Sequence, residues 1–466
     1  MDAPPPDAPP SPTPAQAARA AARAALRERT EAVIARAEAR LAAMAAAGPQ
    51  AAVVHVRLSD AEEVLAIPYL SQRSVLSYLR QDEVLGLRAA SRTCREAVAE
   101  HAWSDFDETY PFNKSRIRGR LSSWRACFPL ARAANLCENT KLADAFVHLR
   151  GVRKVNMWGC NQATITDAAF AHLRGIHTLN MSDCKLATIT DAAFTHLRGI
   201  HTLDMWNCNQ AAITDAVFAN LRGIHTLNMS GCHQATITDE AFANVRGIHT
   251  LNMGGCWQTT ITDAAFVHLR GIHTLNMSGC NQATITDAAF AHLRGIHTLY
   301  MGCCYQATIT DAAFEHLRGI HTLNMIGCNQ ATITDAAFAP LRGIHTLNMH
   351  GCNHITITEA AFAHLRGIHT LNMSFCYQAT ITDAAFAHLR GIHTLDMRYC
   401  NQATITDAAF AHLADIHTLY MSGCSQITDA AMAHLVGIRE LHIVGCPQLT
   451  DAALAPLKDR GAIIHR

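Results

Sequence analysis

Apolar and polar positions recur with a fixed period of 24 residues from Gly151 to Asp415, without insertion or deletion. In the unit that begins at Gly175, polar residues alternate with Leu179 and Met181, which is the period of a short β-strand. Leu179 and Met181 are therefore expected to point into a core, and the polar residues between them to line the opposite face. Nearly the same sequence begins again at Gly199, Gly223, Gly247, Gly271, Gly295, Gly319, Gly343, Gly367 and Gly391.

The second half of each unit has the pattern of a short helix. Thr190 or Asp191 can cap its first turn, because either side chain accepts free backbone N–H groups. Phe194 and Leu197 are three residues apart and share one helix face, which we expect to be buried. Gly199 can adopt the left-handed conformation that ends the helix and starts the next strand.

A strand–turn–helix–turn unit repeated at this period predicts an α/β solenoid, a horseshoe of short parallel strands and helices in which each unit packs only on its neighbours. Two shorter, 22-residue units follow from Asp415 and Gly437. Most of the chain is thus expected to form a scaffold with a long surface and no catalytic pocket.

Composition and pattern divide the chain into six regions. Within the second of these regions, residues 15–47 are expected to be either a solvated helix or linker, or a partner-binding helix. The regions are a disordered Pro-rich segment (1–14), an Ala/Arg-rich helix and linker (15–59), a small all-α module (60–110), a connector (111–134), about 13 repeats (135–458) and a C-terminal cap (459–466).

The repeat resembles the cysteine-containing class of leucine-rich repeats. The residues that carry this resemblance in one unit are Leu179, Met181, Cys184, Ile189, Thr190, Asp191, Phe194 and Leu197. The 24-residue units contain two more turn residues than is usual in that class, and they have Phe where Leu is commoner.

Residues 67–98 resemble the F-box, since Ile67-Pro68 is followed by Tyr78-Leu79, Asp82-Glu83-Val84 and Ser91-Arg92. Leu70 and Cys94 depart from the usual acidic residue and Trp of that motif. An F-box before leucine-rich repeats implies a substrate receptor of a Skp–cullin–F-box ubiquitin ligase. The resemblance implies that the module docks a Skp-type adaptor, and hence a cullin complex, through Pro68, Leu76, Leu79, Val84 and Leu87. The repeats would then hold the protein to be ubiquitinated near the conjugating enzyme.

Other functions fit the same sequence. The helical module could merely seal the end of the solenoid, which would leave an interaction scaffold with no ligase link. The repeats could also be an expanded array that binds nothing specific. In each case the chain is expected to be no enzyme, and to need no cofactor, because identical copies of a residue set provide no single tuned site.

Charge and hydropathy change this picture little. The formal net charge is zero and only 16% of residues are charged, so no global field favours nucleic acid or an anionic membrane. No run of 18 apolar residues is present, so no transmembrane helix is expected, and the N-terminus lacks the pattern of a secretory signal. The chain is expected to be a monomer within a complex, in the cytoplasm or nucleus. The Cys ladder from Cys160 to Cys446 is expected to be buried and free of disulfides.

Histidines form two ladders, one from His177 to His417 and a second from His172 to His412. They are either neutral surface residues of a copied repeat or a device that senses acid. No metal site is expected, because the best local set, His350, Cys352 and His354, matches no standard zinc spacing.

The positions where the copies disagree are the candidates for binding. They lie at the ends of the predicted strands, and exposed aromatic and Arg residues commonly anchor protein interfaces. Neutral drift after duplication would produce the same variation. These residues are Trp158, Trp206, Trp257, Tyr300, Tyr305, Ile326, His350, Phe375, Tyr377, Arg398, Tyr399 and Tyr420.

Overall fold

The computed structural model describes residues 96, 99, 120–137, 146–354 and 356–466. The chain divides into two units, Met1–Asn135 and Leu136–Arg466. In the first unit, helix α6 (Leu121–Cys127) buries Leu121 and Trp124, and strand β1 (Ala133–Asn135) follows it. The F-box-like residues Pro68, Leu76, Leu79, Val84 and Leu87 lie outside the described residues.

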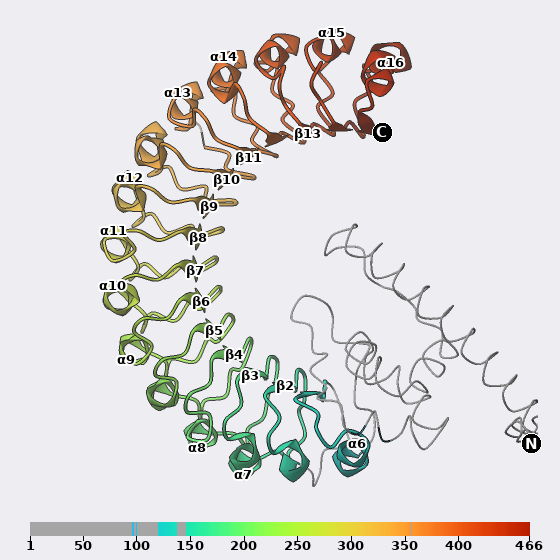
Figure 1. Cartoon of the computed structure of the whole chain (residues 1–466). Coiled ribbons are helices and arrows are strands. Elements are labelled where there is room, and N and C mark those ends of the chain that lie inside the picture. The colour runs from blue at the N-terminus through green and yellow to red at the C-terminus, as the bar shows by residue number, and fades with distance from the viewer. Residues whose placement is uncertain (1–95, 97–98, 100–119, 138–145, 355) are drawn as a thin grey trace, which may run out of the picture. The chain divides into compact units, whose positions relative to one another are not determined.

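The second unit is a curved solenoid with parallel strands on its inner side and helices on its outer side (Figure 1). Each strand pairs with the next in the chain and in the same register, as with Thr346 and Thr370. The strands are β2 (Lys154–Asn156), β3 (Thr178–Asn180), β4 (Thr202–Asp204), β5 (Thr226–Asn228), β6 (Thr250–Asn252), β7 (Thr274–Asn276), β8 (Thr298–Tyr300), β9 (Thr322–Asn324), β10 (Thr346–Asn348), β11 (Thr370–Asn372), β12 (Thr394–Asp396), β13 (Thr418–Tyr420), β14 (Glu440–His442) and β15 (Ile463–His465).

Among the described residues, no helix is long and apolar enough to span a lipid bilayer. The outer elements are short α- or 3₁₀-helices of three to nine residues, and those that follow a capping Thr begin directly after it. They are η1 (Phe146–Leu149), α7 (Asp167–Phe170), η2 (Ala171–Leu173), α8 (Asp191–Phe194), η3 (Asp215–Asn220), α9 (Asp239–Ala243), α10 (Asp263–Phe266), η4 (Val267–Leu269), α11 (Asp287–Phe290), α12 (Asp311–Phe314), η5 (Glu315–Leu317), η6 (Asp335–Leu341), α13 (Glu359–Phe362), α14 (Asp383–Phe386), η7 (Ala387–Leu389), η8 (Asp407–His412), α15 (Asp429–Met432) and α16 (Asp451–Asp459).

The core consists of columns in which the same residue type stacks from unit to unit. The predicted inward positions Leu179, Met181, Cys184 and Phe194 are all fully buried, and so are their equivalents in the neighbouring units. Gly175 adopts a left-handed φ of 78° where helix gives way to strand, as expected for that position.

Polar contacts also join neighbouring units, but less regularly than the apolar columns, since the side-chain amides of Gln258, Gln330 and Gln402 form no hydrogen bond. At the junction of units 247–270 and 271–294, the buried Cys280 thiol donates to the Met253 carbonyl oxygen at 3.1 Å. The Gln282 side-chain amide donates to the Cys256 carbonyl oxygen at 3.1 Å. These bonds satisfy carbonyl groups in the interior, where an unpaired polar group would be costly.

The acidic residue at the helix start bonds mainly to the neighbouring unit. Thr286 caps α11 by accepting from the Ala288 N–H at 3.2 Å. Asp263 of the preceding unit accepts both the Thr286 N–H and the Thr286 hydroxyl, each at 2.7 Å. Of the two caps that the sequence allows, the Thr is therefore the cap, and the Asp holds the next unit's Thr in place.

The two additional turn residues of the 24-residue units also join neighbours. Ala283-Thr284 stands between Gln282 and Ile285, where the last two units have nothing. The Thr284 hydroxyl donates to the Ile261 carbonyl oxygen at 2.8 Å, so the insertion adds one hydrogen bond at this junction.

The C-terminal cap is a further strand. Ile463 and Ile464 lie in β15, which pairs with β14 and leaves Ile463 exposed.

We predict that Asp287→Ala lowers the free energy of unfolding by about 1.5–3 kcal/mol, since the carboxylate accepts two hydrogen bonds from Thr310. Asp287→Asn keeps an acceptor for the Thr310 N–H and should cost less than half as much. Urea denaturation measures both, and hydrogen exchange at the Thr310 amide should accelerate only in the Ala variant. Equal stability of the two variants would contradict the role assigned to the carboxylate.

Candidate binding face

The twelve variable residues occupy four positions of the repeat, all at or just after the inner strands. Tyr300 and Tyr420 are the third residues of their strands, and the others lie in the turn that follows. Trp206, Trp257, Tyr300, Tyr305, Tyr377 and Tyr399 are exposed, with Trp257 the most so at 58%. The expectation that these positions lie on the inner side of the solenoid is consistent with the strand placement (Figure 1).

Four of these residues, His350, Phe375, Tyr377 and Tyr399, form one cluster over three consecutive units, which we call the aromatic patch. The Phe375 ring lies 5.0 Å from His350, 6.1 Å from Tyr377 and 4.6 Å from Tyr399. Gly423 leaves room for the Tyr399 ring, because a Cβ there would lie 2.5 Å from Tyr399 Cδ1. The patch is therefore a packed surface of rings rather than scattered aromatic residues.

Backbone strain accompanies the aromatic patch. Phe375 and Tyr399 both have a left-handed φ of 58°, at a position that most other units fill with Gly. A bulky residue in this conformation costs roughly 1–2 kcal/mol relative to Gly. Two large rings are thus held at a conformational cost that a Gly would avoid.

Smaller aromatic contacts lie elsewhere on the strand-exit turns. Trp257 stacks on His233 with ring centroids 4.4 Å apart, and His233 was not singled out from the sequence. The Tyr305 hydroxyl forms a hydrogen bond with the Cys303 thiol, which raises the pKa of Tyr305. Trp257 thus contacts the His233 ring and Tyr305 the Cys303 thiol, and neither residue belongs to the aromatic patch.

Arg398 and Tyr420 belong to a polar cluster at the end of the inner face. The Arg398 guanidinium forms a bidentate ion pair with Asp396, which raises the pKa of Arg398, and it lies 5.8 Å from the Tyr420 ring centroid. Tyr420 in turn stacks on His442 at 4.3 Å. His442, Glu440 and His465 extend the cluster, and the repeat pattern gave no signal for them because they fall in its last, irregular units.

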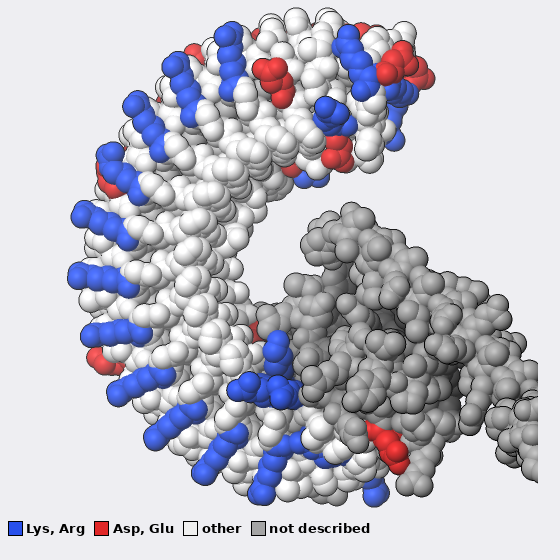
Figure 2. Space-filling model, viewed as in Figure 1, with Lys and Arg blue, Asp and Glu red and all other residues white. Residues whose placement is uncertain are grey.

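The helix-to-strand rim carries the two histidine ladders. Rings of the first ladder, from His177 to His417, stack at 4.4–4.6 Å, and each Nδ1 lies about 3.1 Å from the hydroxyl of the following Thr. In the second ladder, the Arg side chain of one unit bonds the next unit's His, as Arg270 Nε does to His292 Nδ1 at 3.3 Å. Basic side chains form a regular row along the outer margin, whereas few charges occur along the inner face (Figure 2).

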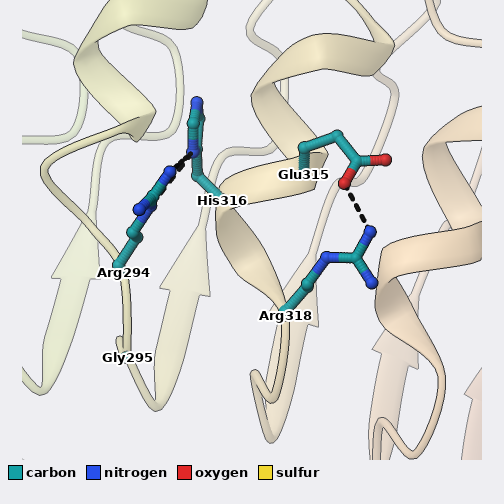
Figure 3. Close-up of a pocket in the computed structure, with 5 residues that line it drawn as sticks. All are labelled: Arg294, Gly295, Glu315, His316 and Arg318. Atoms are coloured by element: carbon teal, nitrogen blue, oxygen red, sulfur yellow. Dashed lines mark hydrogen bonds and ion pairs between the residues drawn. The ribbon is translucent and has the colours of Figure 1, made fainter.

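A shallow depression on this rim is lined by Arg294, Gly295, Glu315, His316 and Arg318 (Figure 3). Arg294 points to His316, and Arg318 forms an ion pair with Glu315 at 2.6 Å. Except for Glu315, the preceding unit has equivalents of these side chains, so the depression contains no distinctive catalytic set.

The cysteine column consists of buried thiols without disulfide bonds. Every cysteine in the described residues is a free thiol, in agreement with the expectation for the ladder. Burial raises the pKa of Cys232, Cys304 and Cys376 to about 12, which keeps these thiols protonated at neutral pH. Cys352 belongs to the same column, because it is also buried and its thiol donates to the Met325 carbonyl oxygen. The set His350, Cys352 and His354 therefore does not meet in one metal site.

The fold and its inner face define a leucine-rich-repeat solenoid. The model of the BspA-type leucine-rich repeat region matches the chain in six copies, within residues 143–269, 233–345 and 331–448, which together cover more than half of it. The chain therefore belongs to the BspA-type leucine-rich repeat family. The resemblance seen in the sequence is thus confirmed for leucine-rich repeats, and the family model supplies the BspA type.

Solved structures with a similar fold have low sequence identity to the chain. The TLR13 chain of a TLR13–ssRNA13 complex is 16% identical, with a TM-score of 0.54, over 73% of this chain and 54% of that one. Drosophila Toll, in a glycosylated Toll–Spatzle complex, is 14% identical, with a TM-score of 0.51, over 68% and 47%. This chain thus spans about half the length of these proteins, and the likeness concerns the fold. None of the curated proteins compared with the chain matches it in sequence.

We predict that acid destabilises the solenoid through the first histidine ladder. Partial desolvation and the charge of adjacent rings lower the pKa of His225, His273, His321 and His369 in the folded chain. The unfolded chain then binds protons more readily, so stability falls as the pH drops below about 7 through the ordinary histidine pKa of about 6.5. Melting temperatures between pH 8 and pH 5.5 should show this fall.

Replacing these four residues by Gln should flatten the pH dependence. The melting temperature at pH 8, where the imidazoles are neutral, gives the structural cost of the substitutions by itself. A slope identical to that of the unmodified chain would contradict the assignment.

Proposed function

We propose that the chain is a protein-binding scaffold that holds a partner on the inner face of its solenoid, through the aromatic patch. The proposal rests on one observation above all, which is that Phe375 and Tyr399 occupy left-handed positions that Gly would fill without strain. Residues kept in strained conformations cluster at functional sites. The two rings also contact each other across adjacent units, with centroids 4.6 Å apart.

The chemistry of the patch suits a protein surface. Rigid aromatic rings provide large contact area at low entropic cost, and Tyr377 and Tyr399 add exposed hydroxyl groups. The chain contributes binding and positioning in this proposal, and no catalytic group.

Restoring the common residues of the repeat should abolish partner binding. The variant Phe375→Gly/Tyr377→Asn/Tyr399→Gly removes the rings and relieves the strain, so it should keep its melting temperature within a few degrees. Loss of interface anchors worth about 2 kcal/mol each should weaken partner binding by tenfold or more. Partners are identified by crosslinking to the unmodified chain, and their affinities are measured with purified proteins.

A matched control carries three changes on the outer helices, Ala264→Ser, Ala288→Ser and Ala312→Ser, at exposed positions. It should bind partners as the unmodified chain does. Equal binding by the patch variant and the control would show that the rings are not the anchors, and would favour drift.

We also propose, on the sequence alone, that the scaffold is linked to a ubiquitin ligase. What supports this is the order of the segments, an F-box-like spacing from Ile67-Pro68 to Arg92 followed directly by leucine-rich repeats. In this version the N-terminal module docks a Skp-type adaptor, and the aromatic patch binds the protein to be modified, in the cytoplasm or nucleus.

Co-purification of the full chain with a Skp-type adaptor tests this link. The unmodified chain should retain the adaptor, and a Pro68→Ala/Leu79→Ala variant should lose it, while partner binding at the aromatic patch is unchanged in both. No retention by a folded, unmodified chain would leave the scaffold function without the ligase.

A further inference from the structure

The last two strands of the solenoid depart from the repeat at adjacent positions. Glu440 stands where the preceding strand has Thr418, and His442 stands at the position of Asn in most other strands. His465 of β15 pairs in register with His442 of β14. These departures place one carboxylate and two imidazoles together on neighbouring strands.

The three side chains converge on a small volume. Glu440 Oε1 lies 3.0 Å from His442 Nε2 and 3.3 Å from His465 Nε2. The two rings stack with centroids 4.1 Å apart and an interplanar angle of 9°. Among the described residues, this is the one group of three His, Cys, Asp or Glu side chains whose ligand atoms all lie within 4.8 Å of one another.

These separations fit the edges of a coordination polyhedron. Zinc binds imidazole nitrogen and carboxylate oxygen at about 2.0–2.2 Å. Two ligands of such an ion are then separated by about 2.9 Å in octahedral geometry and about 3.4 Å in tetrahedral geometry. The spacing of Glu440 from both histidines falls within this range. The two stacked rings must turn toward each other for both Nε2 atoms to face one ion.

The donor set also limits which ion can bind. Two imidazoles with one carboxylate suit Zn²⁺, Co²⁺, Ni²⁺ or Cu²⁺, whereas Mg²⁺ and Ca²⁺ prefer oxygen ligands throughout. Without an ion, each Nε2–H donates to the carboxylate, and a bound ion would replace both protons. The side chains are 23–46% exposed, so the site is accessible from solvent.

We propose that Glu440, His442 and His465 bind one divalent transition-metal ion, with Zn²⁺ as its typical representative. Three protein ligands leave at least one coordination position open. The ion would also join the terminal strand β15 to β14. This site departs from the expectation that the chain binds no metal, and it does not depend on the proposed partner-binding function.

The experiment counts tight metal sites on the full chain, produced without a histidine tag. Zn²⁺ is titrated against a chromophoric chelator, and the unmodified chain should bind one equivalent tightly. His442→Asn restores a common residue of the repeat, and His465→Ala removes the second imidazole. Since losing an outer-shell partner alone costs about 10- to 100-fold in affinity, each variant should bind Zn²⁺ at least about 100-fold more weakly.

The control must exclude binding by the histidine ladders. His417→Asn removes a ladder residue outside the cluster and should keep the tight site. Co²⁺ provides a second measurement, because its d–d absorption should report nitrogen and oxygen ligands in the unmodified chain and in His417→Asn only. Zn²⁺ should raise the melting temperature of these same two proteins and leave His442→Asn unchanged.

Three results would overturn the proposal. The first is no tight site in the unmodified chain, which would reduce the cluster to hydrogen bonds between Glu440 and the two histidines. The second is a tight site that survives in both His442→Asn and His465→Ala. The third is equal loss of the site in His417→Asn, which would assign the metal to the ladder.

Discussion

The contact between adjacent units is the constraint on which the rest of the structure depends. Neighbouring units are joined by a thiol that donates to a carbonyl, a carboxylate that accepts from the next Thr and, at many junctions, a Gln amide that donates to a carbonyl. A unit therefore completes the hydrogen bonding of its neighbour as well as its core. The last two units are two residues shorter and still keep these contacts, since Thr428 bonds Asp407 and Cys446 donates to the Met421 carbonyl oxygen.

The same constraint determines where the chain can vary. Positions that form the columns keep buried apolar residues, whereas the third strand residue and three positions of the following turn vary in residue type. Phe375 and Tyr399 lie at these variable positions, and Glu440 lies in the last, irregular unit. Binding chemistry can therefore accumulate on the inner side without disturbing the stack, and the aromatic patch and the proposed metal site are two such accumulations.

The period alone predicts the buried columns, the strand-and-helix unit and the inner location of the variable residues. It does not predict that Asp263 bonds to Thr286 of the next unit, because an acid at a helix start has a sufficient local explanation as a cap. Nor does it predict the meeting of Glu440, His442 and His465, since β15 lies beyond the repeated text and its register with β14 is a property of the folded chain. The contacts among His350, Phe375 and Tyr399 depend on the positions of their rings, which the spacing of these residues in the sequence does not determine.

Removal of one complete unit tests this account most directly. Deleting residues 271–294 joins Arg270 to Gly295 and keeps the repeat sequence continuous. If each unit packs only on its neighbours, the shortened chain should fold with the same circular dichroism per residue, unfold cooperatively, and lose only the stability of one unit and one junction. A shortened chain that is unfolded or that loses cooperative unfolding would show that contacts beyond nearest neighbours hold the structure together.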